Sequence, residues 1–422
     1  MKIAVVGGGI TGLVIANELI KKKKKVLLFE ADEKLGGLAR SFKRTGWQWP
    51  LEEFFHHFFT SDNEVKKLLK ELGLGDKLFY QDVKTSVYYQ GRIYPFDSPS
   101  DFLSFPPLGL FDKLRMGSAI FALRQLPFLS AFDKFATEDY FPKLIGVSGW
   151  EIIWQRLMEG KFGESADKVS FAWFWSRLKK RSKKLGYLEG GSEIFLDALG
   201  ESIKKRADIF LKTPVLEIEL ENNQWKLRTK RKEFMADKVV LAIPMPQALK
   251  LAKRHLSEEK MELWQNLETI GALTMVLRLK KKFLPGETYW LNILEKEFPF
   301  VAIVEQTNFI DPSFYKDEYL VYVGGYYHPD NPIFNWSKKT IFNHFAPHLR
   351  RLNPSFENFL IDFDVFSSLF AQPIIPVNYS KIKPQFELIP DSLYWANANH
   401  IYPWDRGVNF SIKLGKKLSR LV

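Results

Sequence analysis

The chain has 422 residues, a formal net charge of +12 and no cysteine. The length indicates two or three domains, or two interleaved ones. The lack of cysteine excludes disulfides, thiolate nucleophiles, iron–sulfur clusters and cysteine-based zinc sites, so any redox chemistry must come from a bound cofactor. The basic charge does not by itself indicate nucleic acid, because no helix-turn-helix, zinc or RNA-binding motif accompanies it.

The first residues predict a dinucleotide-binding unit. An apolar strand over residues 3–6 leads into the turn Gly7-Gly8-Gly9-Ile10-Thr11-Gly12, then a helix, then a second strand ending in Glu30. This is the order that such a unit needs. Gly7 permits the tight turn, Gly9 lets the backbone approach a pyrophosphate, and Gly12 lets helix and strand pack closely. The helix N-terminus would face the phosphate charge, and Glu30 would accept a hydrogen bond from the adenosine ribose.

A second glycine pair, Gly36-Gly37, follows the acid, with Leu38 and Arg40 directly behind it. A glycine pair in this position gives another close approach of backbone to phosphate. Arg40 supplies a counter-charge there.

Residues 64–185 contain three successive sequence patterns. Residues 64–80 form an amphipathic pattern that predicts a helix stopped by glycines. Residues 84–94 predict a hairpin that turns at Gln90-Gly91. Residues 98–185 are mainly helical in pattern and rich in aromatic side chains.

Alternating α/β elements return in the second half. In chain order the patterns predict a helix over 192–205, a hairpin over 216–229, a buried parallel strand over 239–243, strands within 271–330 and a helix over 337–352. The chain closes with a strand at 393–397, a glycine turn at 405–409 and a helix over about 410–421.

Residues 105–145 combine Phe, Leu and Pro with interspersed basic residues. Two interpretations stay open: burial within a substrate domain, and peripheral contact with a membrane surface. No run approaches the roughly 20 apolar residues of a membrane span. Because Met1 leads directly into the first strand, no signal peptide is predicted and a cytoplasmic location is expected, with or without membrane association.

Four segments together resemble the FAD-dependent amine oxidase superfamily, which includes protoporphyrinogen oxidases, phytoene desaturases, monoamine oxidases and UDP-galactopyranose mutases. They are the IAVVGGGITGL turn with Glu30, the Gly36-Gly37…Arg40 doublet, the Pro214-Val215 hairpin leading to ADKVVLAIP, and the C-terminal YWAN…RGVNFSIKLG. The resemblance implies an α/β fold in which a Rossmann-like, NAD(P)-binding-like FAD domain of the GR2 type is interleaved with an α+β substrate domain. The implied FAD domain covers residues 1–90, 186–250 and 372–422, and the substrate domain covers 91–185 and 251–371.

The resemblance also implies residue roles toward FAD. The pyrophosphate would be held by the two glycine segments, the ribose by Glu30 and the adenine by the backbone of Val215. The residues implied to bind the cofactor are Gly7, Gly9, Thr11, Gly12, Glu30, Gly36, Gly37, Leu38, Arg40, Val215, Asn397, Arg406, Gly407, Val408 and Asn409. Asn397 stands where relatives carry an acid toward the ribityl chain. The backbone N–H groups of residues 407–409, at the start of the last helix, would stabilise negative charge on the reduced flavin.

Near the flavin ring the chain departs from its relatives, since Pro50-Leu51-Glu52 replaces an aspartate-x-glycine pattern. His56 and His57 follow within a phenylalanine cluster and are candidate catalytic residues, because mutase-like relatives place a histidine close to the flavin here. The alternative is that both only pack among the aromatic rings. No metal is expected, because adjacent histidines rarely share an ion and no partner motif lies nearby.

The implied function is an FAD-dependent oxidoreductase that abstracts a hydride from an apolar or part-apolar small molecule, with oxygen or a quinone as later acceptor. One alternative is a flavin-dependent mutase of a sugar nucleotide without net redox change. It would need arginines placed for a diphosphate, and Arg92, Arg156 and Arg177 are available. A scaffold without activity is a third interpretation. Candidate cavity residues are Tyr322, Tyr326, Tyr327, Trp395, Tyr402 and Trp404. The oligomeric state and the identity of the substrate stay open.

Overall fold

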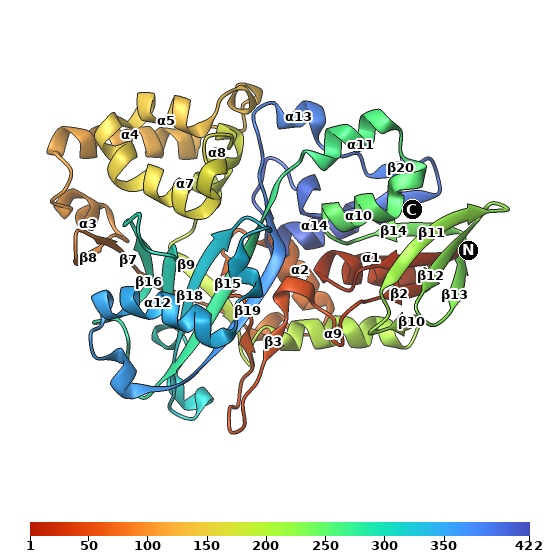
Figure 1. Ribbon diagram of the computed structural model, residues 1–422, viewed down its shortest axis with the longest axis horizontal. Coiled ribbons are helices and arrows are strands. Elements are labelled where there is room, and N and C mark those ends of the chain that lie inside the picture. The colour runs from red at the N-terminus through yellow and green to blue at the C-terminus, as the bar shows by residue number, and fades with distance from the viewer.

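The computed structural model describes residues 1–422, arranged around two large sheets (Figure 1). One sheet has six strands in the order β10-β2-β1-β14-β21-β20. Their bounds are β1 Lys2–Val6, β2 Lys25–Phe29, β10 Ala207–Phe210, β14 Lys238–Leu241, β20 Glu387–Ile389 and β21 Leu393–Trp395. All neighbours pair in parallel except the edge strand β20. Strands from the start, middle and end of the chain therefore share one sheet.

Both faces of this sheet are covered, and alternate side chains of β1 point to opposite faces. Ile3 and Val5 pack against helices α1 (Ile10–Lys21), α9 (Glu193–Lys204) and α14 (Val408–Leu418). Ala4 and Val6 lie on the side of a three-stranded meander of β11 (Val215–Glu221), β12 (Gln224–Thr229) and β13 (Glu233–Ala236). Burial on both faces explains why these strands are continuous apolar runs.

The other sheet has seven strands in the order β19-β15-β18-β17-β16-β7-β8. Their bounds are β7 Lys84–Tyr89, β8 Arg92–Pro95, β15 Thr269–Leu279, β16 Thr288–Ile293, β17 Ala302–Glu305, β18 Tyr319–Tyr327 and β19 Leu360–Pro373. Helix α12 (Lys338–Leu352) covers one face, with Phe345 and Leu349 packed on Leu273 and Leu277. The predicted hairpin over 84–94 is confirmed as β7–β8, and it lies wholly in this sheet.

Residues 98–185 form a helical lobe beside the second sheet (Figure 1). Its helices are α3 Pro99–Ser104, α4 Leu110–Gln125, α5 Thr137–Ile145, α6 Val147–Gly149, α7 Gln155–Phe162 and α8 Phe171–Lys180. Phe141, Phe174 and Trp175 are buried in its core. The high aromatic content of this stretch therefore serves packing to a large extent.

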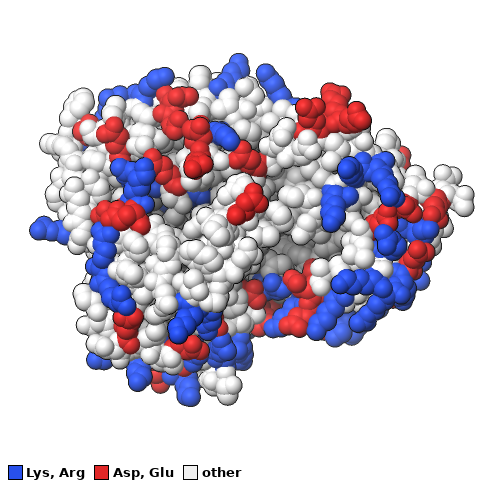
Figure 2. All heavy atoms as spheres, viewed as in Figure 1, with Lys and Arg blue, Asp and Glu red and all other residues white.

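Shorter elements connect these parts. They are α2 Asn63–Glu71, α10 Met245–Ala252, α11 Glu258–Gln265, α13 Tyr379–Ile382, β3 Ser41–Phe42, β4 Leu51–Glu52, β5 Phe58–Phe59, β6 Leu78–Asp82 and β9 Lys184–Leu188. On the face shown in Figure 2 the surface is hollowed between the part that carries the six-stranded sheet and the rest of the molecule.

The amphipathic helix predicted within residues 64–80 and stopped by glycines is confirmed as α2, but the residues after Gly75 form another element. Helix α2 ends at Glu71, and Gly73, with φ +73°, turns the chain away. The following residues form β6, which pairs antiparallel with β9 from Leu78 against Leu188. A partner more than a hundred residues away stabilises this strand, and local periodicity cannot report such a partner.

No helix in the structure is both long and apolar enough to cross a bilayer.

Candidate active site

The glycine turn after β1 brings α1 into direct contact with the sheet. Gly7 has φ +110°, and a Cβ placed on it would lie 2.4 Å from the carbonyl oxygen of Ala242. A Cβ on Gly12 would lie 1.9 Å from the Gly7 carbonyl oxygen, so no larger residue fits there. A Cβ on Gly9, by contrast, would meet no protein atom within 4 Å. Gly7 and Gly12 are therefore packed tightly against protein atoms, whereas the space beside Gly9 is free for a ligand.

The second glycine pair docks directly on the first turn. The backbone N–H of Gly36 donates to the Gly8 carbonyl oxygen at 2.8 Å, and Gly9 and Gly36 form an isolated parallel bridge. Gly36 and Gly37 have φ +118° and +56°, a conformation that favours glycine. Two stretches of exposed backbone thus meet, with Leu38 in the short helical turn that follows Gly36.

Glu30 connects the glycine turn after β1 to the segment after β2 and to the segment before β11. Its Oε2 accepts from the Gly8 N–H at 2.7 Å, and its Oε1 accepts from the Asp32 N–H at 2.9 Å. Its carbonyl oxygen accepts from Thr213 at 2.8 Å, two residues before Val215. The structure therefore brings Glu30, the glycine turn and the start of β11 together.

Arg40 is turned toward acids in this structure. Its Nη1 lies 2.7 Å from Asp32 and its Nη2 lies 3.5 Å from Glu53, while its buried Nε has no hydrogen-bond partner. Arg40 also lines a groove of about 950 Å³ between α9 and β10. None of the glycines of residues 7–12 lines this groove. Its carboxylates would repel a pyrophosphate, and they are Glu33, Glu193, Asp197, Glu201 and Asp208.

The C-terminal segment completes the site. Asn397, just after β21, accepts from the Asn399 N–H at 3.2 Å, and its buried Nδ2 has no partner. Helix α14 follows Gly407, where a Cβ would meet nothing within 4 Å. Thr11 on α1 donates its hydroxyl to the Ser411 carbonyl oxygen at 3.5 Å, so the starts of α1 and α14 lie side by side.

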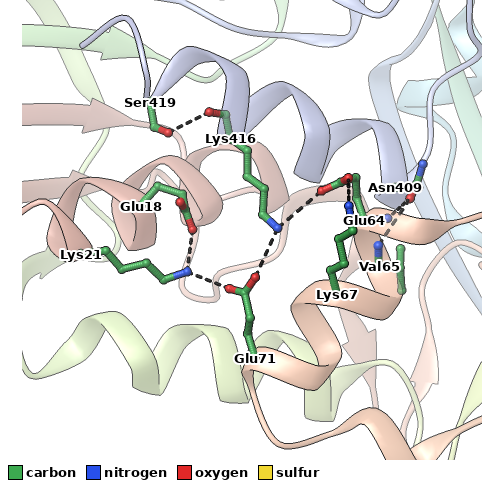
Figure 3. Close-up of polar contacts among 9 residues, drawn as sticks. All are labelled: Glu18, Lys21, Glu64, Val65, Lys67, Glu71, Asn409, Lys416 and Ser419. Atoms are coloured by element: carbon green, nitrogen blue, oxygen red, sulfur yellow. Dashed lines mark hydrogen bonds and ion pairs between the residues drawn. The ribbon is translucent and has the colours of Figure 1, made fainter.

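Polar contacts fix α14 against α1 and α2 (Figure 3). The Asn409 Oδ1 accepts from the Glu64 N–H at 2.9 Å and caps the start of α2. Lys416 lies 3.4 Å from Glu64 and 3.5 Å from Glu71, and Lys21 of α1 lies 2.7 Å from Glu71. The Oδ1 of Asn409 is thus engaged in the protein, while its backbone N–H lies in the first turn of α14.

These residues fit a bound dinucleotide. Helices α1 and α14 both begin without a capping side chain and without an acid in the first turn, so their positive dipole ends are not neutralised. The open spaces at Gly9 and Gly407 leave room for a ligand beside them, and Arg40 Nε and Asn397 Nδ2 are unpaired donors.

Glu52 anchors the segment that carries the two histidines. Tyr187 donates its hydroxyl to both carboxylate oxygens of Glu52 at 2.8 and 2.6 Å, and Tyr322 donates to the Glu52 carbonyl oxygen at 2.9 Å. Burial raises the pKa of Glu52 although these hydrogen bonds oppose the shift. The buried group ties β4 to β9 and β18, and so fixes where the chain enters residues 53–57.

His56 and His57 lie deep in the protein yet keep some accessible surface. Burial lowers the pKa of His56 to about 4, and the charge of Arg406 acts in the same direction. Burial lowers the pKa of His57 to about 3, helped by the charges of Arg181 and Arg177. Both rings are therefore neutral at pH 7.

A group of cations faces these histidines, and we call Lys161, Arg177, Arg181 and Arg406 the cation cluster. Asp405 is the acid within it. Lys161 Nζ lies 3.8 Å from Asp405 Oδ2, Arg177 pairs with the same oxygen, and Trp173 Nε1 donates to Oδ1 at 3.0 Å. Burial opposes ionisation of Asp405, but the charges of Lys161 and Arg177 outweigh it and lower its pKa.

The side chain of Arg406, which the resemblance implies to bind the cofactor, lies in the cation cluster. Its Nε donates to Gln372 Oε1 at 3.0 Å, and its Nη2 donates to the Tyr326 hydroxyl at 3.2 Å. Of the six aromatic residues predicted for a cavity, Tyr326 is the one that contacts Lys161 and Arg406. Tyr322 and Trp395 are fully buried core residues instead.

Comparison with known proteins decides the family. The sequence model described as flavin containing amine oxidoreductase matches residues 10–372. The chain belongs to this family. The predicted recognition, α/β fold class and cofactor FAD are thereby confirmed.

Individual relatives of this flavoprotein are distant. The amine oxidase [flavin-containing] A of Canis lupus familiaris is 22% identical over 332 residues, covering 72% of this chain and 62% of the relative. Cyclohexylamine oxidase from Brevibacterium oxydans IH-35A superposes with a TM-score of 0.76 at 14% identity, covering 99% and 98% of the two chains. Reduced UDP-galactopyranose mutase gives 0.76 at 14%, covering 99% and 94%. At these identities the solved structures establish the fold.

The flavoprotein's cation cluster was largely missed from the sequence. Arg177 was considered for a diphosphate, but Lys161, Arg181 and Asp405 were not singled out. Arg156, considered beside Arg177, pairs with Glu159 at 3.2 Å, and Arg92 lies exposed on β8. No motif links Lys161, Arg177 and Asp405, because they come from three segments that only the fold brings together.

We expect Gly9→Val to abolish FAD retention while the protein still folds, because the added side chain occupies space that holds no protein atom. FAD released per chain after denaturation measures retention, and thermal unfolding of the flavin-free protein measures the fold. Gly12→Val is the matched control: its Cβ would overlap the Gly7 carbonyl oxygen, so this variant should unfold at lower temperature or fail to fold. Normal FAD content in Gly9→Val would contradict the assignment of the turn.

Proposed function

We propose that this flavoprotein removes a hydride from a carbon atom of a part-apolar small molecule and later passes the electrons to oxygen or a quinone. The observation that carries the proposal is the convergence of both glycine turns, Glu30 and the N-terminus of α14 at one end of the six-stranded sheet. The chain spans about 62% of the dog amine oxidase and about half of the Oncorhynchus mykiss amine oxidase, so the relatives' own reactions are not carried over as such.

The residues already described would hold FAD along the sheet. The backbone around Gly9 and Gly37 would receive the pyrophosphate, Glu30 the ribose hydroxyls, and Val215 the adenine. Bound FAD would supply the hydride acceptor. The uncapped N–H groups at the start of α14 would stabilise negative charge on the ring system when it is reduced.

His56 has a defined role in this proposal. Its Nδ1 contacts the Phe54 carbonyl oxygen, and because a carbonyl only accepts, that nitrogen carries the hydrogen. The neutral ring therefore keeps its lone pair on Nε2. It can accept a proton from the substrate there, whereas a protonated histidine could not.

The alternative is a flavin-dependent mutase of a sugar nucleotide without net redox change. The specific observation in its favour is the cation cluster, since Arg177 and Arg181 offer guanidinium groups suited to a diphosphate. The two functions differ in whether electrons leave the substrate.

Anaerobic mixing of the FAD-loaded protein with candidate substrates separates the two functions. Relatives' names suggest an amine, 15-cis-phytoene and protoporphyrinogen as a first panel. We expect one compound to bleach the visible flavin absorption, and oxygen or a quinone to restore it. Turnover of a sugar nucleotide only after chemical pre-reduction, without consumption of the reductant, would replace this function by the mutase.

We also propose that the helical lobe rests on an anionic membrane surface. Ten large apolar side chains of this lobe are exposed: Leu103, Leu110, Phe111, Leu114, Phe121, Leu126, Phe128, Leu129, Phe135 and Val147. We call them the apolar patch. Arg115, Arg124, Lys134 and Lys143 lie in the same stretch of chain and would face lipid phosphates.

Vesicle binding tests this contact. The double substitution Phe111→Ser and Phe121→Ser removes two of the most exposed rings, and we expect cosedimentation with vesicles containing phosphatidylglycerol to fall at least about tenfold. Leu220→Ser, an exposed leucine on β11 of the other domain, is the matched control and should bind as the wild type does. Equal vesicle binding by the double variant and the control would contradict the contact.

A further inference from the structure

The cation cluster holds more positive charge than its own acid can balance. Lys161, Arg177 and Arg406 all act on Asp405, and Arg181 lies close enough to Arg177 for their charges to repel. Asp405 is the one carboxylate that pairs with Lys161 and Arg177. Like charges held together in a poorly solvated place are unfavourable unless a counter-charge is supplied.

Two of these cations, Arg177 and Arg181, are exposed at the C-terminal end of α8. On α8, Ser176 and Leu178 are buried, yet the side chain of Arg177 is 50% exposed. Arg181, directly after α8, is also exposed and makes no ion pair. The Arg177 guanidinium pairs with Asp405 and lies 5.7 Å from the Trp173 ring centre, and the charges of Arg177 and Arg181 both act on the buried His57. Both cations are therefore accessible to a ligand, and Arg177 also contacts the buried Asp405.

The aromatic faces at this place are already used by the protein's own cations. The Lys161 ammonium lies 4.9 Å from the Trp173 ring centre and 5.3 Å from that of Tyr326, and the Arg406 guanidinium lies 5.9 Å from Tyr326. Such faces are where a substrate ammonium group would bind. A cationic substrate would have to displace Lys161 and would be repelled by its neighbours.

We propose that the substrate carries an oxyanion, a carboxylate or a phosphate, which binds Arg177 and Arg181 of the cation cluster, and that free amines are excluded. This inference rests on the proposed function, because it names the chemical class of that function's substrate. The oxyanion supplies the counter-charge that Asp405 alone does not provide. Arg177 keeps unused N–H groups while it pairs with Asp405, since a guanidinium has five of them.

Burial and neighbouring cations lower the pKa of Lys161 well below its usual value. A bound oxyanion would raise this pKa again, because a nearby negative charge favours the charged ammonium. The substrate's anionic end would thereby be held at the base of α7 and α8, with its apolar part directed toward His56 and His57.

Difference absorption spectra of the FAD-loaded protein test this inference without turnover. The probes are 3-phenylpropionate, phenyl phosphate and 3-phenylpropylamine, which share a phenyl group and differ in charge. We expect at least one anion to perturb the bound flavin spectrum at millimolar concentrations, while the amine leaves it unchanged. The two anions distinguish a carboxylate from a phosphate as the preferred group.

Variants identify the residues that bind the anion. Arg177→Met and Arg181→Met should each raise the dissociation constant of that anion at least about tenfold, the usual effect of removing a charged hydrogen-bond donor. Arg181→Met breaks no ion pair, so it keeps the test valid even if Arg177→Met is unstable. Arg156→Met, on α7 but paired with Glu159, is the matched control and should bind like the wild type.

Perturbation by the amine, no perturbation by either anion, or equal anion binding by both cluster variants and the control would overturn this inference. The proposed function fails separately, when no compound of any charge reduces the flavin. Anion binding is measured on oxidised flavin and does not depend on that result.

Discussion

The structure depends on one contact that only glycine permits, the approach of α1 to the turn after β1. A side chain at Gly12 would overlap the carbonyl oxygen of Gly7, so the first turn of the helix lies directly on the strand end. This places the N–H groups of α1 at the edge of the sheet, where Gly8 can hold Glu30 and accept the second glycine pair. The remaining parts of the cofactor site are fixed relative to this contact.

The C-terminal segment joins this site to the place where substrate would react. Residues 405–409 carry Asp405 and Arg406 into the cation cluster and, within a few residues, begin α14 beside α1. Lys416, Glu71 and Asn409 hold α14 against α1 and α2 (Figure 3). Only a few residues of chain therefore separate the cation cluster from the helix that would face the flavin.

The sequence predicts those parts of the molecule whose characteristic pattern lies within one continuous segment of the chain. The turn at residues 7–12, Glu30 and the hairpin of β11 and β12 each have a local pattern, and each is present. The domain boundaries and the roles of individual residues toward FAD stay predictions. The resemblance to known flavoproteins, which rests on four separated segments, implies that the first, middle and last stretches of the chain form one domain, and the α/β pattern of these stretches predicts the same interleaving.

The missed features are those that depend on distant partners. The sequence does not predict strand β6, because this strand is stabilised by pairing with β9. Lys161, Arg181 and Asp405 look like ordinary charged residues in the sequence, since nothing in their spacing indicates that α7, α8 and the segment before α14 meet. Their unusual surroundings become visible only once burial and neighbouring charge are known.

Titration of the flavin-free protein with FAD and with FMN tests the central claim most directly. Most of the proposed contacts, at Gly9, Gly37, Glu30 and Val215, reach the pyrophosphate and the adenosine of FAD, whereas FMN lacks the adenosine monophosphate part and keeps a single phosphate. We expect one equivalent of FAD to bind per chain and FMN at the same concentrations to remain free after ultrafiltration. Binding of FMN as tight as that of FAD would contradict the account.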